Sequence, residues 1–158
     1  MVALGLVMMG LVGIVVLYTR SFALNRDVVN RTIAAGLAAE GVEIVKNMVD
    51  IHIAERARAG FAAFLDEGSY GPDYASVTND VVTLPPPSTP LHIIGSDTSW
   101  WAYIRQTPGG SVPTGFSRTV SISFLSSDEI LVNSAVEWND RGGTKSVNIE
   151  DHFYNWRP

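Results

Sequence analysis

The first 18 residues of the chain, MVALGLVMMGLVGIVVLY, contain no charged residue and only small, aliphatic or aromatic side chains. As a helix rising about 1.5 Å per residue, this segment would be roughly 27 Å long, which is near the thickness of the hydrocarbon layer of a bilayer. A buried core helix would normally keep a solvent-facing side, and this segment has none. The sequence therefore predicts a membrane-embedded helix over residues 1–18.

A secretory signal peptide is the main alternative for this segment. It fits less well, because the sequence shows no basic stretch before the apolar run and no polar stretch with a small-residue cleavage site after it. Arg20, Arg26 and Arg31 follow on different sides of the continuing helix, as suits the headgroup layer. The positive-inside rule alone would place everything downstream in the cytoplasm, but a stronger basic flank upstream would reverse this, so the orientation stays open.

The overall charge and the cysteine content exclude several classes of function. The net charge is −5, so the chain lacks an overall basic footprint for nucleic acid, although a local patch stays open. The sequence contains no cysteine, which removes disulfides, thiolate metal sites and cysteine nucleophiles.

Residues 19–65 are expected to extend the first helix. Apolar residues fall on two of its sides, one set including Ile33, Leu37 and Ile44 and the other including Val42 and Val49. We expect one side to pack on the chain's own domain and the other on neighbouring copies. No proline occurs before Pro72, so one helix could run into the low fifties, with residues 55–65 as a continuation or as a second short helix.

The remainder of the chain divides into an irregular region, residues 66–117, and a sheet, residues 118–158. The irregular region is rich in proline and glycine, and short strands are expected near 74–77 and 101–105. In the C-terminal region, RTVSISFL, ILVNSAVEW and TKSVNIEDHFYNW alternate apolar and polar residues and are separated by turn sequences. These patterns predict a three-stranded antiparallel meander with one apolar face, which the helix is long enough to cover. The predicted fold class is α+β.

Candidate catalytic or metal-binding residues do not form a recognisable pattern. His52, His92 and His152 are far apart in sequence, and strand alternation separates the neighbouring acids Glu150 and Asp151. The sequence also lacks a serine nucleophile elbow and a phosphate-binding loop. We expect no enzyme activity, cofactor or metal. The aromatic cluster Trp100, Trp101 and Tyr103 could line a surface binding loop for a sugar or a base, or could pack on the sheet.

The chain resembles the type IV pilin and pseudopilin superfamily, the subunits of bacterial type IV pili, type II secretion systems and DNA-uptake filaments. The resemblance lies in VALGLVMMGLVGIVVL (Val2–Leu17), AAEGVEIVKNMVD (Ala38–Asp50) and the closing sheet sequence from Ser117 to Trp156. It scarcely touches the middle third. It implies a minor pilin or pseudopilin that assembles through its hydrophobic helix, whose candidate contact residues are Val2, Leu4, Leu6, Leu11, Ile14 and Leu17.

The resemblance also implies a location and a set of partners. The subunit would stand in the inner membrane before assembly with its C-terminal domain outside, and in an extracellular filament afterwards. The family's basic leader, its cleavage junction and an early glutamate do not occur in this sequence. Met1 aligns several residues inside the mature helix, so we expect the coding sequence to continue upstream, and processing by a prepilin peptidase would require that leader.

Charged residues on the helix are candidates for contacts between subunits, namely Arg20, Arg26, Arg31 and Glu40. Glu40 lies near the apolar stripe, where a buried unpaired carboxylate would be costly. We expect it either to meet Arg26 or Arg31 of a neighbouring subunit or to lie solvated at the rim. The alternative function is a single-pass, membrane-anchored extracytoplasmic domain that binds or adheres by itself.

Overall fold

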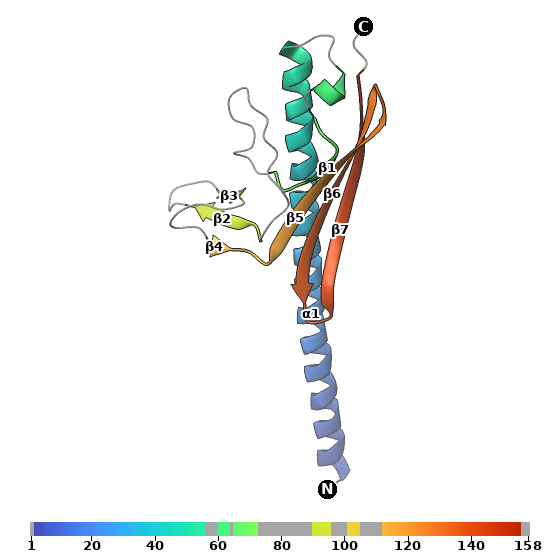
Figure 1. Cartoon of the computed structure of the whole chain (residues 1–158). Coiled ribbons are helices and arrows are strands. Elements are labelled where there is room, and N and C mark those ends of the chain that lie inside the picture. The colour runs from blue at the N-terminus through green and yellow to red at the C-terminus, as the bar shows by residue number, and fades with distance from the viewer. Residues whose placement is uncertain are drawn as a thin grey trace. The chain divides into compact units, whose positions relative to one another are not determined.

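The computed structural model describes residues 2–55, 60–63, 65–72, 90–95, 101–104 and 112–155 (Figure 1). The chain divides into two compact units, Met1–Ile33 and Ala34–Pro158. Helix α1, Val2–Glu55, contributes residues to both units. The second unit, here called the sheet domain, also holds all the strands of the described ranges, so the α+β class is confirmed.

The first unit is helical, and its residues 2–18 are uncharged and exposed on all sides. Its large hydrophobic side chains are exposed from Val2 through Val29, with Val2 81% and Met9 78% exposed. The helix is long and apolar enough to cross a membrane, and none of its most apolar stretch is buried. The predicted exposed apolar helix is therefore present, and its length and composition meet the requirement for a membrane span.

The part of α1 in the sheet domain buries most of both predicted apolar sides. Leu37 and Ile44 from one side, and Val42 and Val49 from the other, are all buried within this domain. The solvent face of this part of the helix is a separate stripe, formed by Gly36, Ala39, Glu43, Lys46, Asn47 and Asp50. The expectation that one of the two apolar sides stays uncovered for neighbouring copies is therefore wrong between residues 37 and 49.

The main sheet is antiparallel and has four strands in the order β1-β5-β6-β7. Its strands are β1 (Gly68–Tyr70), β5 (Phe116–Ser126), β6 (Glu129–Asp140) and β7 (Gly143–Tyr154). The predicted meander is confirmed by β5, β6 and β7, and the β6–β7 turn uses Gly143 at a φ of 109°, a conformation that glycine adopts without strain. The fourth strand, β1, extends the sheet beyond the predicted three.

The hydrophobic core lies between α1 and the inner face of this sheet. Alternation along β5 and β6 buries Val120, Ile122, Ile130 and Val132, which pack in one cluster with Val45 and Val49 of α1 and with Phe61 and Leu65. Phe61 belongs to the 3₁₀ turn η1, Phe61–Ala63, so the segment after α1 contains a separate short helix. The helix thus covers the apolar face of the sheet, as the sequence predicts.

A second, three-stranded antiparallel sheet has the order β3-β2-β4. It comprises β2 (His92–Gly95), β3 (Trp101–Ile104) and β4 (Val112–Pro113). The strand expected near residues 101–105 is present as β3, whereas the strand expected near 74–77 lies outside the described residues.

Candidate functional site

Four features of the described residues are candidate functional sites: the exposed apolar helix, a buried arginine, a polar cluster around Glu129, and a pocket on the outer face of the sheet. The residues predicted for assembly, Val2, Leu4, Leu6, Leu11, Ile14 and Leu17, are each more than half exposed. Further along the same unit, Phe22, Leu24 and Val28 are 58%, 64% and 61% exposed. Exposed apolar side chains therefore continue well beyond the uncharged segment 1–18.

Two of the four charged residues predicted to contact other subunits, Arg31 and Glu40, have partners within the chain. Arg31 Nε lies 3.2 Å from the Asp27 carboxylate, one helical turn earlier. Glu40 Oε2 lies 3.4 Å from Nη1 of Arg118, so its carboxylate has a cation within its own chain. Arg20 and Arg26 lie on the exposed surface of the first unit. The predicted contacts between subunits at these four residues stay predictions.

Arg118 is the buried residue that sequence reasoning missed. Its side chain has no exposed surface, and its guanidinium donates to the Leu37 carbonyl at 2.9 Å and to the Pro72 carbonyl at 2.6 Å. The strand alternation that places Val120 and Ile122 inward also places residue 118 inward, and this signal could have found it. Arg118 fastens α1 and the segment before residue 73 onto β5.

A small cluster of polar side chains lies where β6 begins and β7 ends. Glu129 Oε1 accepts from the Tyr154 hydroxyl at 2.9 Å and lies 2.8 Å from His152 Nδ1. These two hydrogen bonds, with His152 making the larger contribution, lower the pKa of Glu129 below its ordinary value. The hydrogen bond to Glu129 raises the pKa of Tyr154. The cluster is exposed, and no group of three or more acids or histidines suited to a metal ion occurs in the described part of the chain.

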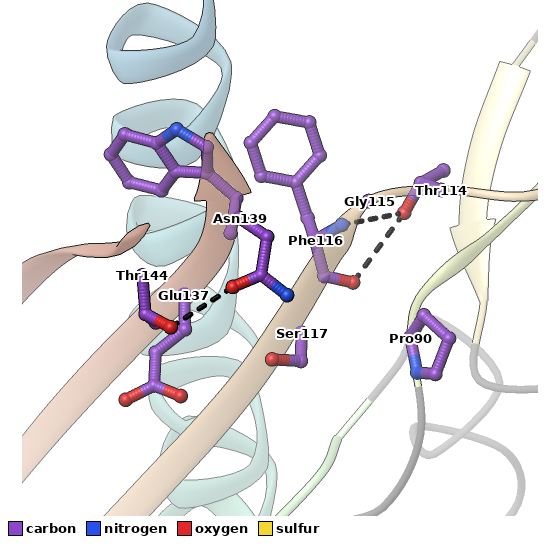
Figure 2. A pocket seen from close by; sticks show the side chains of 9 residues that line it. Pro90, Thr114, Gly115, Phe116, Ser117, Glu137, Asn139 and Thr144 are labelled. Atoms are coloured by element: carbon purple, nitrogen blue, oxygen red, sulfur yellow. Dashed lines mark hydrogen bonds between the residues drawn. The ribbon is translucent and has the colours of Figure 1, made fainter. Parts of the chain in front are cut away.

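The pocket has a volume of about 410 Å³ and lies where the outer face of the sheet meets the segments around Pro90 and Thr114 (Figure 2). Ser117 and Glu137 face each other across β5 and β6, and Asn139 and Thr144 do so across β6 and β7. The Thr144 hydroxyl donates to the Asn139 side-chain oxygen at 2.9 Å. Neighbouring strands therefore present four polar side chains to one cavity.

Backbone hydrogen bonds hold the opposite wall of the pocket against β5. Leu91 N donates to the Phe116 carbonyl at 2.7 Å, and the Leu91 carbonyl accepts from Thr114 N at 2.8 Å. The Thr114 hydroxyl also accepts from Phe116 N at 3.3 Å. Leu91 itself is buried, so Pro90 next to it is carried on an anchored segment.

The predicted surface loop is only partly within the described residues. Trp101 and Tyr103 belong to β3, where their backbones pair with Gly95 and Ile93 of β2. Trp100 lies outside the described residues. The described residues that line the pocket come from other positions, namely 90, 114–117, 137–139 and 144.

No protein-family model, curated protein or solved structure matches the chain.

Proposed function

We propose that the chain is a non-enzymatic structural subunit, a minor pilin or pseudopilin, that assembles through its hydrophobic N-terminal helix into a filament of the type IV pilus or type II secretion kind. The observation that carries this proposal is the helix of the first unit, whose large apolar side chains are exposed on all sides. The α+β sheet domain, with one helix covering an antiparallel meander, is the second part of the resemblance.

The length of the exposed apolar surface favours assembly over simple anchoring. A single-pass anchor needs about 20 apolar residues, which residues 1–18 nearly supply alone. Phe22, Leu24 and Val28 stand beyond that segment, among the charges of Arg20, Arg26 and Asp27. Contiguous exposed apolar surface of this kind marks a contact site for a membrane or for another protein. Packing against the helices of other subunits would cover it.

In this proposal the subunit is anchored in the inner membrane before it joins the filament, with the sheet domain on the extracytoplasmic side. Its partners are the helices of other pilin-like subunits, and a prepilin peptidase only if an upstream leader exists. Glycines at positions 5, 10 and 13 support close helix approach, because no atom outside the local backbone lies within 4 Å of a Cβ built there and small residues let membrane helices come together.

The alternative is a membrane-anchored domain that binds its ligand as a monomer. It requires the helix to span the bilayer but predicts no specific contact between copies. The two proposals therefore differ in what happens when the helix beyond the membrane segment is altered.

The test replaces Leu24 and Val28 together by glutamine in the full chain, and replaces Ser21 and Asn25 by glutamine as the matched control. Both pairs are exposed and one turn apart, and neither change alters the segment 1–18. We expect the Leu24/Val28 variant to stay in the membrane but to lose copy-to-copy association in cross-linking or in filament preparations, while the control associates normally. Unchanged association in the Leu24/Val28 variant would contradict assembly through this part of the helix.

A further inference from the structure

The pocket on the outer face of the sheet has features that assembly through the helix does not use. Its volume of about 410 Å³ lies within the range of small-molecule sites. Hydroxyl, amide or carboxylate groups stand on five of its side chains, namely Thr114, Ser117, Glu137, Asn139 and Thr144, and Pro90 adds a small apolar ring. Their chemistry limits what the pocket can bind.

The pocket offers both hydrogen-bond donors and hydrogen-bond acceptors. The carboxylate of Glu137 only accepts hydrogen bonds, whereas the Ser117 hydroxyl opposite it both donates and accepts. The Asn139 oxygen already accepts from Thr144, which leaves the amide nitrogen to donate. In Figure 2 this nitrogen points away from Thr144, on the side of Ser117. A ligand that matches the pocket must therefore offer donors and acceptors close together, as neighbouring hydroxyl groups do.

The charge of the pocket limits the charge that its ligand can carry. Glu137 is the one charged residue among the nine described residues that line it. An anionic ligand would be repelled by this carboxylate and would meet no cation among these residues. A neutral ligand with several hydroxyl groups satisfies the same polar atoms without this repulsion.

The pocket is also held in shape before any ligand arrives. Glu137, Asn139 and Thr144 stand on paired strands, and the Thr144 hydroxyl fixes the orientation of the Asn139 amide. On the opposite wall, the two backbone hydrogen bonds of Leu91 hold Pro90 and Thr114 next to β5. A preformed site loses less conformational entropy on binding than a mobile one.

We propose that this pocket binds one ring of a neutral saccharide. Adjacent sugar hydroxyls would donate to the Glu137 carboxylate and accept from the Asn139 amide, with Ser117 serving a third hydroxyl. The C–H groups of the sugar ring would lie against Pro90. This binding activity does not depend on the proposed assembly, because every residue involved belongs to the sheet domain.

The test uses the full chain in a detergent without a sugar headgroup, because glycosidic detergents would occupy the site. Glucose, galactose, mannose and N-acetylglucosamine are titrated singly and followed by saturation-transfer NMR. We expect at least one of them to bind, and Glu137→Ala and Asn139→Ala each to weaken that binding about tenfold. Glu150→Ala is the matched control, since Glu150 lies on the same outer face but does not line the pocket, and should leave binding unchanged.

A second comparison isolates the charge of Glu137. In a uronate the C6 hydroxymethyl group of a sugar is oxidised to a carboxylate, so the unaltered protein should bind the uronate of its sugar, such as glucuronate for glucose, more weakly than the sugar itself. Glu137→Gln should narrow this difference to about twofold, because it removes the repelling charge and keeps the shape. The proposal is overturned if none of the four neutral sugars binds, if Glu137→Ala and Asn139→Ala bind the sugar as strongly as the unaltered protein, or if the unaltered protein binds the uronate as tightly as the parent sugar.

Discussion

Gly41 of α1 lies so close to Ser134 of β6 that a Cβ atom at position 41 would stand 2.5 Å from the Ser134 hydroxyl oxygen. Arg118 Cδ and Val120 Cγ2 would lie 3.0 and 3.1 Å from this Cβ atom. Glycine at this position therefore lets the helix lie directly on the sheet.

We predict that Gly41→Ala lowers the free energy of unfolding of the sheet domain by about 1–3 kcal/mol, because the added methyl group overpacks the interface. Alanine is favoured over glycine in a helix by roughly 1 kcal/mol, but the cost of overpacking is larger, so the net effect is destabilising. Gly36→Ala is the control, since position 36 is exposed and nothing lies within 4 Å of its Cβ. It should stabilise by roughly 0.5–1 kcal/mol. Urea unfolding of both variants checks the prediction, and an equal response to both would show that the close approach is absent.

Removal of the buried guanidinium should be among the most damaging single changes. Arg118→Met deletes the hydrogen bonds to the Leu37 and Pro72 carbonyls and the contact with Glu40, so we expect a loss of about 3–5 kcal/mol. Arg141→Met, in the exposed β6–β7 turn, is the control and should change stability by less than about 0.5 kcal/mol. Chemical denaturation of the two variants decides the matter. Similar midpoints would mean that Arg118 does not fasten α1 to β5.

Glu40→Gln should cost less than the loss of Arg118. The Glu40 side chain is 36% exposed, so water shares in its solvation, while the Arg118 guanidinium keeps its two carbonyl acceptors. The expected loss is about 1 kcal/mol or less, measured in the same denaturation experiment. A loss as large as that of Arg118→Met would show that the ion pair, and not the carbonyl contacts, holds the helix.

The cluster of Glu129, His152 and Tyr154, here called the Glu129 cluster, should make the stability of this end of the sheet depend on pH at both low and high pH. The pKa of Glu129 is lowered below its ordinary value of 4.5, so its contribution to stability is present above pH 4.5 and is lost as the pH falls through the lowered pKa. The pKa of Tyr154 is raised above its ordinary value of 10.0, so its contribution is present below pH 10 and is lost as the pH rises through the raised pKa. Between these limits the Glu129 carboxylate stays ionised and the Tyr154 hydroxyl stays protonated.

NMR titration of the Glu129 carboxyl tests this description. His152→Ala and Tyr154→Phe should each raise the pKa of Glu129 toward 4.5, with the larger change for His152, whose hydrogen bond is the larger cause. Ser146→Ala, an exposed change elsewhere on β7, should leave the pKa unaltered. An unchanged pKa in the first two variants would mean that the hydrogen bonds do not form in solution.

The sequence predicts the parts of this fold that depend on local periodicity. Alternation along residues 118–154 specifies β5, β6 and β7 together with their inward residues, since one face must be buried. The uncharged run and the lack of proline before Pro72 specify α1. Strand β1 could not be found in this way, because Gly68, Ser69 and Tyr70 carry no alternation and pair with β5 only through the tertiary fold.

The sites were less predictable than the fold because they join residues that are distant in sequence. Glu40 looks unpaired in the helix pattern, and its partner Arg118 lies on a strand 78 positions later. The pocket combines Pro90, the start of β5 and the ends of β6 and β7, none of which carries a motif by itself. The burial of both sides of α1 between residues 37 and 49 likewise depends on how the sheet and the segment around Phe61 wrap the helix.

Cysteine cross-linking in membranes tests the proposed assembly most directly, because the natural sequence contains no cysteine and any disulfide must come from an introduced residue. Single cysteines replace Val12, Leu17 or Leu24 on the exposed helix, and Ser146 on the outer face of the sheet serves as the control. We predict that mild oxidation links copies through the helix positions and leaves the Ser146→Cys protein monomeric. Helix variants that stay monomeric under the same conditions would contradict assembly through the N-terminal helix.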